Sequence, residues 1–238
     1  MRFRADLHIH TDFYEHSRRW HGDFPERIAG GIVESGIDVY AITEHNKISE
    51  NVFRTQEEVE RLLEGTKREI LNLFGVEMTI SYGPYRYHIG YIFEDQFDRN
   101  NLPEMPGIRS DIKELEEFKK SYPGMIILNH PTWKDHVSGD NDVNVTQELI
   151  ESGLIDGVEI LNGTILHNAA SMRVSRSAID MFLQARENGV NVAAIGSSDA
   201  HVGINNPRME SLVGSAVTEY CSTYSDGIFE ALRGNSNN

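Results

Sequence analysis

The 238-residue sequence predicts an α/β fold, in which one sheet of largely parallel strands is flanked by helices. Short apolar runs alternate with longer amphipathic stretches along the whole chain, which is typical of β/α units. The length and the 39% of hydrophobic residues are sufficient for one continuous core. We therefore expect a single domain over residues 1–238, with residues 234–238 as a disordered tail. The alternation alone is compatible with both a closed barrel and an open sheet.

The apolar runs give seven candidate strands, and an alternating aromatic segment gives an extra strand or hairpin arm after the third. The strands are expected at 3–10, 38–45, 71–80, 125–131, 157–163, 191–201 and 215–220, and the arm at 85–93. The helices are expected at 25–35, 50–70, 110–122, 146–152, 174–188 and 225–233. Pro25 suits a first helical turn, and Gly36 and Gly189 suit helix ends. The polar stretches 95–107 and 134–145 are expected to be loops.

The charge balance argues against one class of partner. Lys and Arg number 22 against 37 Asp and Glu, so the formal net charge is -15. Such a field repels nucleic acid backbones, and extended DNA or RNA is therefore a disfavoured partner. Part of the negative charge is expected to be offset by divalent cations bound to carboxylates.

Cysteine usage and hydropathy limit the metal chemistry and the location. Cys221 is the only cysteine, which rules out an intramolecular disulfide and a thiolate zinc site. Any metal must therefore be bound by His, Asp and Glu. The first residues contain no apolar run of signal-peptide length, and no later stretch approaches the ~20 apolar residues of a membrane span. The sequence predicts a soluble, cytoplasmic protein without a membrane partner.

Histidines and carboxylates gather at the carboxyl ends of the predicted strands, where α/β folds place their active sites. The first strand ends in Asp6-Leu7-His8-Ile9-His10, and period-two alternation puts Asp6, His8 and His10 on one face. The arm and the later strand ends carry His45, Glu77, His88, His130, Asp199 and His201. A lone histidine at a strand end carries little weight. Convergence of this many ionisable groups predicts a metal site, because burying them together is costly without cations.

The ligand types indicate which metals to expect. Imidazole and carboxylate ligands without thiolate suit Zn, Mn or Fe(II), and more than four ligands imply more than one ion. Neighbouring ions can generate hydroxide near neutral pH and hold both the attacking and the leaving oxygen of an in-line displacement. The sequence thus predicts a hydrolase with two or three divalent ions.

The motifs resemble the polymerase and histidinol phosphatase (PHP) family of metal-dependent phosphoesterases. The resemblance covers nearly the whole chain, from DLHIHT through ITEHN, GVE, YHIGY, NHP and GVEILNG to GSSDAH. It implies a distorted (β/α)7, TIM-like barrel as a single domain. It also implies three ligand sets: His8, His10, Glu77 and Asp199; Glu15, His45 and His201; and the bridging Glu77 with His88 and His130.

Some positions depart from the family pattern. Glu15 stands where many members have Asp, and the bulkier His16 follows it. Glu44 stands where Asp is more frequent. We expect it to support the ligand His45 without binding the metal itself. The short span between His88 and His130 has no room for the domain that some nucleotide-cleaving members insert there. The specificity of those members is therefore not transferred to this chain.

The remaining roles are assigned to polar residues near the strand ends. We expect Glu77, Asp199 and His201 to be catalytic, and Arg208, Lys134 and Lys47 to bind substrate phosphate. His21 or His136 could donate a proton to the leaving group, whereas His16 and His167 are expected in loops. Glu159 and Asn162 either shape the pocket or cap the rim of the barrel.

The leading functional hypothesis is a phosphatase that hydrolyses a small phosphomonoester by attack of metal-bound hydroxide at a di- or trinuclear site. Its partners would be a small phosphorylated metabolite as substrate and inorganic phosphate as product. The first alternative is a phosphodiesterase or nuclease acting on nucleotides or short oligonucleotides. A non-catalytic metal-binding regulatory module is the second. An amidohydrolase-like C–N hydrolase also begins with His-x-His, but the carboxylated lysine of that family has no counterpart in the sequence.

Overall fold

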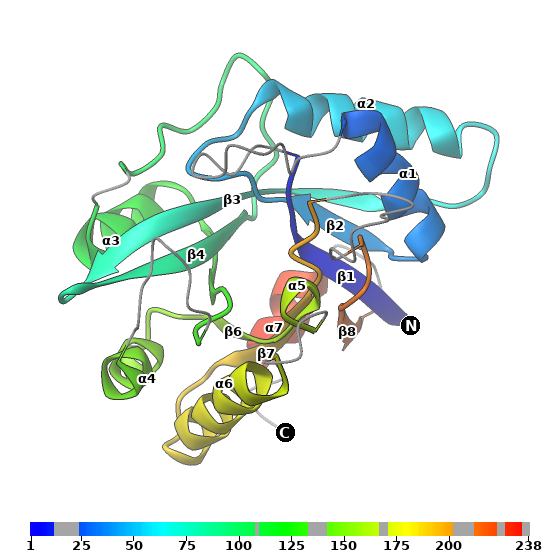
Figure 1. Ribbon diagram of the computed structural model, residues 1–238. Coiled ribbons are helices and arrows are strands. Elements are labelled where there is room, and N and C mark those ends of the chain that lie inside the picture. Colours follow the sequence, from blue (N-terminus) through cyan, green and yellow to red (C-terminus); the bar gives the residue numbers. More distant parts are fainter. Residues whose placement is uncertain are drawn as a thin grey trace.

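The computed structural model describes residues 1–11, 24–107, 110–132, 142–166, 171–201, 212–222 and 227–234 (Figure 1). Its centre is one eight-stranded sheet in the order β7-β6-β5-β4-β3-β2-β1-β8. The strands are β1 (Arg2–Ile9), β2 (Val39–Ile42), β3 (Leu71–Tyr82), β4 (Tyr85–Phe93), β5 (Gly124–Leu128), β6 (Gly157–Asn162), β7 (Ala193–Ser197) and β8 (Thr218–Cys221). All seven predicted strands and the predicted arm are thus present.

The sheet is mixed, because two strands run against the others. Parallel pairs join β1 to β2, β2 to β3, β5 to β6 and β6 to β7. The predicted arm is β4, which pairs antiparallel with both β3 and β5. A tight turn at Gly83, with φ of 59°, connects β3 to β4 without a crossover helix. The last strand, β8, pairs antiparallel with β1.

The two edges of the sheet meet, so that it nearly closes into a barrel. The Thr218 hydroxyl accepts a hydrogen bond from the Gly196 amide and donates one to the Gly196 carbonyl, each at 3.0 Å. A Cβ atom on Gly196 would lie 2.6 Å from the carbonyl oxygen of Val217, so only glycine permits this approach of the two backbones. The predicted class, an α/β TIM-like barrel, is confirmed.

The described residues form seven helices, most of which cover the outside of the sheet (Figure 1). They are α1 (Pro25–Ser35), α2 (Glu50–Leu63), α3 (Ile112–Ser121), α4 (Val143–Glu151), the unpredicted α5 (Gly163–Leu166), α6 (Ser171–Glu187) and α7 (Ile228–Gly234). As predicted, Pro25 begins α1 and Gly36, with φ of 74°, ends it. The helix expected to reach residue 70 ends at Leu63, because Glu64 leaves the helical region and Gly65 is left-handed. Within the described ranges, none of the helices combines the length and the apolar composition needed to cross a membrane.

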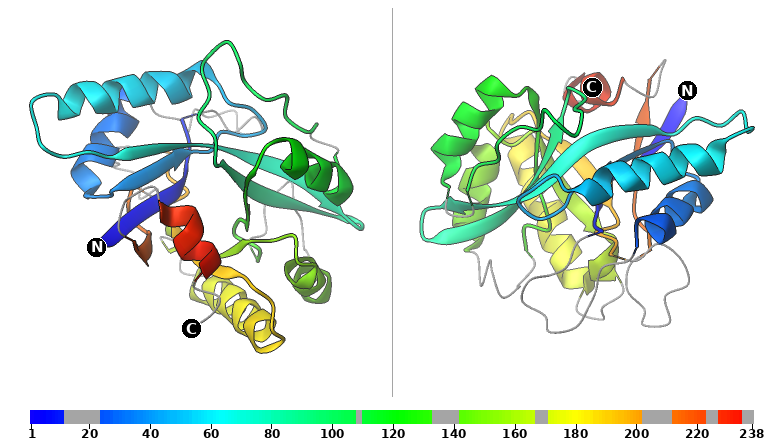
Figure 2. Two further views of the ribbon diagram at one scale, coloured as in Figure 1. Left: turned by 180° about the vertical axis from the view of Figure 1, so that it is seen from behind. Right: turned by 90° about the horizontal axis from the view of Figure 1, so that it is seen from above.

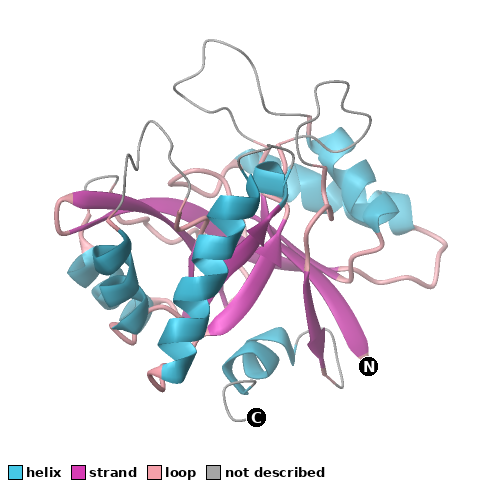
Figure 3. Cartoon of the chain, turned by 60° about the horizontal axis from the view of Figure 1, so that its bottom comes forward, coloured by secondary structure: helices cyan, strands magenta, loops and turns pink. Residues whose placement is uncertain are grey.

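Two apolar layers hold the barrel together. The outer layer lies between the sheet and helices α1 to α4 and α6. The inner layer joins residues of nearly every strand, among them Ala5, Val39, Leu73, Ile127 and Ile195. Helix α7 packs Ile228 and Leu232 against this inner layer, at the end where the strands begin (Figure 2, Figure 3). The inner apolar layer therefore fills the start of the barrel, and polar side chains of the strands follow it at the carboxyl end.

Candidate metal centre

The structure brings eight of the nine expected metal ligands together at the carboxyl ends of the strands. They come from β1, β3, β4 and the segments that follow β1, β2, β5 and β7: His8, His10, His45, Glu77, His88, His130, Asp199 and His201. Alternate residues of a strand share a face. The inward positions of Leu73 and Ile127 are therefore followed, on the same faces, by Glu77 and Asn129. The ninth expected ligand, Glu15, lies outside the described residues.

Glu77 stands at the centre of the cluster, and its two oxygens face different imidazoles. Its side chain is 2% exposed. Oε1 faces three ring nitrogens, at 3.2 Å from His8 Nε2, 3.2 Å from His130 Nε2 and 3.4 Å from His88 Nδ1. Oε2 faces two, at 3.2 Å from His45 Nε2 and 3.5 Å from His10 Nε2. This arrangement is suited to a carboxylate that bridges two ions.

Asp199 forms the second anionic group of the cluster. Its Oδ1 lies 3.4 Å from His10 Nε2, 3.6 Å from His8 Nε2 and 3.8 Å from His201 Nδ1. The ring of His10 lies between those of His45 and His201, with centroid distances of 4.4 Å to each. The three expected catalytic residues, Glu77, Asp199 and His201, are therefore within one cluster.

Three non-glycine residues with positive φ occur among the described residues, and all three lie at strand ends of this cluster. They are Asn46 (56°), His130 (26°) and Asp199 (51°). Hydrogen bonds hold each of them: from Asn46 N to Glu77 O at 2.8 Å, from His130 N to Glu159 Oε2 at 2.7 Å, and from Thr164 Oγ1 to Asp199 O at 2.8 Å. Such conformations cost about 1–3 kcal/mol each and persist where the surrounding structure imposes them. The backbone is thus strained where it aims the ligand side chains.

One expectation about the first strand is wrong. Asp6 does not share a face with His8 and His10, because the register of β1 shifts between Asp6 and Ile9. The Asp6 carboxylate instead accepts hydrogen bonds from the amides of Ser198, at 2.9 Å, and Gly214, at 2.8 Å. Burial raises the pKa of Asp6 to about 6, although these hydrogen bonds oppose the shift. Asp6 therefore connects the end of β7 to the segment before β8. Of the three residues expected on one face, His8 and His10 belong to the cluster and Asp6 does not.

Asn129 is a residue of the site to which the sequence assigned no role. Its Nδ2 donates to Glu77 Oε1 at 2.9 Å and lies 3.4 Å from His8 Nε2. Strand alternation would put Asn129 and His130 on opposite faces, but at the positive φ of His130 its side chain turns to the face of Asn129, and both side chains contact Glu77. The sequence did contain a signal for Asn129. It follows the apolar Ile127 by two residues in a predicted strand, and alternation therefore places both side chains on the same face.

The other expected residues lie around the cluster or outside the described part of the chain. Glu44 is buried and accepts a hydrogen bond from the Thr11 hydroxyl, and its backbone carbonyl accepts one from the Glu77 amide at 3.1 Å. Lys47 is exposed. Residues outside the described ranges include the expected phosphate ligands Arg208 and Lys134 and the histidines His16, His21, His136 and His167.

The cluster shifts the pKa values of its members in opposite directions. Burial raises the pKa of Glu77, but the charges of His8 and His88 outweigh it and hold that pKa well below the usual range. The pKa of Asp199 is likewise lowered, because His8 and other imidazoles outweigh burial. Burial lowers the pKa of His130, whereas the hydrogen bond and charge of Glu77 raise it to about 9. The pKa of His8 is raised well above its usual value by Glu77, Asp199 and Glu159, against the effect of burial.

These shifts predict that metal binding releases protons. Below its pKa of about 9, His130 binds a proton in the metal-free protein, and His8 does so as well. Metal ligation requires neutral imidazoles, so at pH 7 we expect net release of protons, and metal affinity should increase as the pH rises towards 9. Glu77 and Asp199 are already ionised and contribute none. Calorimetric titration with Zn²⁺ in two buffers of different ionisation enthalpy measures the proton count, and equal heats in both buffers would contradict the prediction.

The donor set fits divalent cations. Four groups of three potential ligand atoms lie within 4.8 Å of one another: His10, His45 and His201; His8, His130 and Asp199; His8, His10 and Glu77; and Glu77, His88 and His130. An imidazole nitrogen has one lone pair, so the groups that share His8, His10 or His130 cannot all be occupied through the same nitrogen. His10 can therefore join either His8 and Glu77, as the family resemblance implies, or His45 and His201.

The space for Asn129 depends on a glycine in the neighbouring strand. A Cβ atom on Gly90 would lie 2.8 Å from Asn129 Oδ1. We expect Gly90→Ala to displace the buried amide from Glu77 and to lower the free energy of unfolding by about 1–3 kcal/mol. Metal affinity should fall about 10-fold or more, because residues that support ligands contribute on this scale. Urea unfolding with chelator and titration with Zn²⁺ measure the two effects.

A matched substitution controls for the added methyl group. At the exposed Gly107 a Cβ atom would meet, among the described residues, only Ser110 Oγ, at 3.9 Å. Gly107→Ala should leave both unfolding and metal affinity unchanged. If Gly90→Ala behaves in the same way, Asn129 is not positioned by Gly90.

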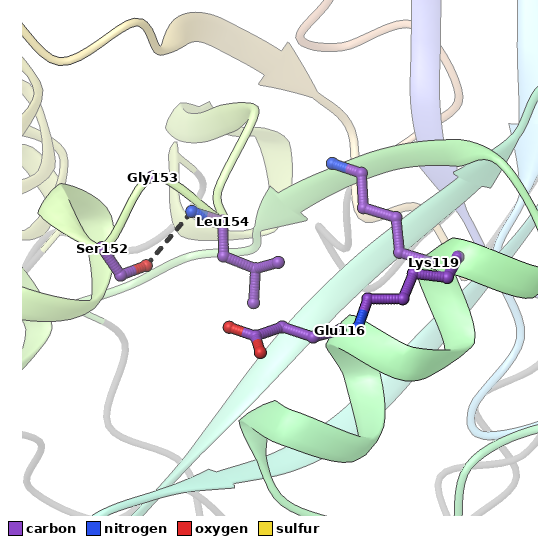
Figure 4. A pocket seen from close by; sticks show the side chains of 6 residues that line it. Glu116, Lys119, Ser152, Gly153 and Leu154 are labelled. Atoms are coloured by element: carbon purple, nitrogen blue, oxygen red, sulfur yellow. Dashed lines mark hydrogen bonds between the residues drawn. The ribbon is translucent and has the colours of Figure 1, made fainter.

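A hollow of about 330 Å³ lies at the opposite end of the barrel, between the end of α3 and the turn before β6 (Figure 4). Its basic residues are already paired: Lys119 Nζ lies 2.6 Å from Asp156 Oδ2, and Lys120 Nζ lies 2.5 Å from Glu117 Oε1. Figure 4 shows the Glu116 side chain extending towards the turn at Ser152–Leu154. Both lysines of this hollow are therefore engaged within the fold, and the histidine cluster is the better candidate for a functional site.

Comparison with known proteins shows the fold. No protein-family model and no curated protein matches the sequence. A candidate metal-dependent phosphoesterase from Bifidobacterium adolescentis has a TM-score of 0.60 and 13% identity, over 96% of this chain and 95% of that one. An amidohydrolase from Chromobacterium violaceum, solved with bound sulfate and without metal, has a TM-score of 0.55 and 17% identity, over 87% and 93%.

A third solved structure covers almost the whole chain. PsfC from Pseudomonas syringae has a TM-score of 0.51 and 17% identity, over 99% of this chain and 96% of that one. At such identities the likeness shows a common fold and nothing finer. The chain therefore has an α/β barrel of a type found in proteins named as metal-dependent phosphoesterase and amidohydrolase, with buried His and Glu groups that could hold metal.

Proposed function

We propose that the chain is a metal-dependent phosphoesterase of the PHP type that hydrolyses a small phosphomonoester. The observation that carries the proposal is the placement of Glu77, whose two oxygens face five imidazoles at 3.2–3.5 Å. The name of the Bifidobacterium structure supports the choice of a phosphate ester. The motif order from DLHIHT to GSSDAH supports it independently.

The residues of the cluster have distinct roles in this proposal. His8, His10, His45, His88, His130 and His201 would hold two or three divalent ions together with Glu77, Asp199 and, outside the described residues, Glu15. Ions held there supply a nucleophile from water near neutral pH and neutralise charge on phosphoryl oxygens. Glu77 and Asp199 remain ionised, because the imidazoles lower their pKa values. Lys47, Lys134 and Arg208 are proposed to bind the phosphate group.

The inner apolar layer limits how the substrate enters. Ile127 and Leu73 fill the barrel below the cluster, so solvent and substrate reach the site from the carboxyl ends of the strands. Two groups that could orient a substrate near this rim are the Glu159 and Asn162 side chains, but both are buried and engaged with each other at 2.9 Å. We therefore assign substrate contact to the basic residues of the loops rather than to these two.

A C–N hydrolase is the second candidate, because the Chromobacterium structure is named an amidohydrolase. A phosphodiesterase or nuclease is the alternative within phosphate chemistry. The net charge of -15 disfavours long nucleic acids as substrates but not nucleotides or short oligonucleotides.

A single screen separates these candidates. The purified protein is assayed for phosphate release over a panel of phosphomonoesters with Mn²⁺, Zn²⁺, Mg²⁺ and Fe²⁺ in parallel. Cyclic diesters and amides are assayed alongside by chromatography of their hydrolysis products, because neither releases phosphate. We expect turnover of at least one monoester, and its loss in Asp199→Ala and His10→Ala purified identically. Equal activity in all three proteins would indicate a contaminating phosphatase, and activity confined to diesters or amides would favour the corresponding alternative.

A further inference from the structure

Glu159 is a buried carboxylate on β6 that lies beneath the histidine cluster. Its side chain has no exposed surface. It receives four contacts: His8 Nδ1 lies 3.0 Å from Oε1, the Ser197 hydroxyl donates to Oε1 at 2.7 Å, the His130 amide donates to Oε2 at 2.7 Å, and Asn162 Nδ2 donates to Oε2 at 2.9 Å. A carboxylate has about four acceptor positions, so Glu159 is fully engaged. The contacts come from four different parts of the chain.

We infer that Glu159 is a positioning residue that selects the metal-binding tautomer of His8 and assembles the ligand group of His8, His130 and Asp199. The inference deepens the proposed function, because it rests on this cluster binding metal. Glu159 then has a specific role, whereas the sequence indicated only that it shapes the pocket or caps the rim of the barrel.

The first part of the inference concerns the two nitrogens of His8. A neutral imidazole has one N–H donor and one nitrogen with a free lone pair. The carboxylate of Glu159 can only accept a hydrogen bond from Nδ1. The proton of neutral His8 therefore belongs on Nδ1 and the lone pair on Nε2. Nε2 is also the nitrogen that faces the site, at 3.2 Å from Glu77 Oε1 and 3.6 Å from Asp199 Oδ1. Glu159 therefore directs the free lone pair of His8 to the position where a metal ion would bind.

The second part concerns His130 and Asp199. The other oxygen of Glu159 accepts from the amide of His130, whose φ of 26° brings its Nε2 to 3.2 Å from Glu77 Oε1. Asn162 connects the same oxygen to Asp199, since its Nδ2 lies within 3.2 Å of Asp199 Oδ2. Glu159 thus reaches each of the three ligands by a different route. These three residues, His8, His130 and Asp199, also form one of the potential metal-binding groups.

Glu159 reaches one group of potential metal ligands and makes none of its four contacts with another group, and this difference distinguishes a positioning role from general support of the fold. The group of His10, His45 and His201 is built on the ends of β1, β2 and β7, and the four contacts of Glu159 go to other residues. Loss of the Glu159 charge should therefore weaken one class of metal sites and spare the other.

The wild-type protein provides the first test. Long-range ¹⁵N–¹H correlation spectra of the Zn²⁺-loaded protein report which ring nitrogen of each histidine carries the proton, and His8→Gln identifies the His8 signals by their absence. We expect His8 with the proton on Nδ1 and metal on Nε2. The opposite tautomer in the loaded protein would overturn the inference, and this result does not depend on the folding of a variant at position 159.

The second test uses the isosteric Glu159→Gln variant and counts metal sites without an activity assay. Competition titrations with a chromophoric chelator give the number and affinity of Zn²⁺ sites. We expect one class of sites to weaken about 10- to 100-fold and the His8 tautomer signal to become mixed. The matched control is Glu151→Gln on α4, a carboxylate that accepts from Gln147 at 2.6 Å and Asn188 at 2.9 Å far from the cluster. The control should bind as wild type.

The outcomes separate the inference from the proposed function. A wild-type protein that binds no divalent ion removes the proposed function and the inference with it. A wild-type protein that binds ions, with Glu159→Gln binding equally many at equal affinity, overturns the inference alone. Weakening of all sites to the same extent also overturns it, because that pattern indicates a general effect on the fold.

Discussion

Replacing Glu77 with glutamine is expected to cut the turnover of a phosphate ester by at least ~10²-fold and to lower the number of bound metal ions. The substitution keeps the volume of the side chain but removes the charge that faces five imidazoles, and it replaces one carboxylate oxygen by an NH2 donor. Because Glu77 is proposed to bridge two ions, loss of its charge should weaken the binding of more than one ion. The measurements are elemental analysis of protein loaded with metal and kcat on the best substrate of the screen.

The control for this variant is Glu187→Gln, an exposed carboxylate on α6. Circular dichroism should show that both variants keep the wild-type fold. Glu187→Gln should keep its metal content and its kcat. If Glu77→Gln also retains both, the central placement of Glu77 has no functional meaning and the proposed site is wrong.

Removal of metal by a chelator is expected to lower the melting temperature by roughly 10 °C or more. An ion present at 1,000 times its dissociation constant stabilises the folded state by about 4 kcal/mol, and in a chain of this size each kcal/mol corresponds to about 2–4 °C. The physical basis is the burial of His8, His10, Glu77 and His88, each 5% exposed or less, within one cluster. Differential scanning calorimetry before chelation, after chelation and after return of Zn²⁺ measures the change.

Asp199→Ala serves as the comparison for metal removal. This variant loses the potential metal ligand that forms a group with His8 and His130, so its melting temperature should respond much less to the chelator than that of wild type. A wild-type melting temperature that is unaffected by chelation and by added metal would show that the cluster does not bind ions in the folded protein.

Much of the fold and of the ligand set could be predicted from the sequence, because both depend on regular periodicity. Strands of parallel type end at one edge of the sheet, so residues such as His45, Glu77 and Asp199 were expected to converge despite their distance in sequence. The start of α1 at Pro25 and its end at Gly36 were predictable from local backbone preferences.

The residues that escaped prediction lie where regular alternation stops. Register shifts in β1, before Ile9, and in β6, after Glu159, change which side chains face the site. The positive φ of His130 turns its side chain to the same side as that of Asn129, and no pattern of residue types announces that conformation. Asp6 was misplaced for the first reason, whereas Asn129 was overlooked although its position two residues after Ile127 predicts an inward side chain. The roles of Arg208 and Lys134 stay predictions, because both lie outside the described residues.

The pairing of β1 with β8 has a consequence for the order of folding. β1 completes its pairing only when residues 218–221 are available, and the Met1 amino group bonds to the carbonyl of Ser222, 221 residues along the chain. Contacts of such separation form slowly, since the intervening chain must be ordered first. During synthesis His8 and His10 emerge long before Asp199 and His201. We therefore expect the histidine cluster to assemble late, after most of the chain has left the ribosome, and until then its histidines are exposed to any ion that a partly folded chain can capture.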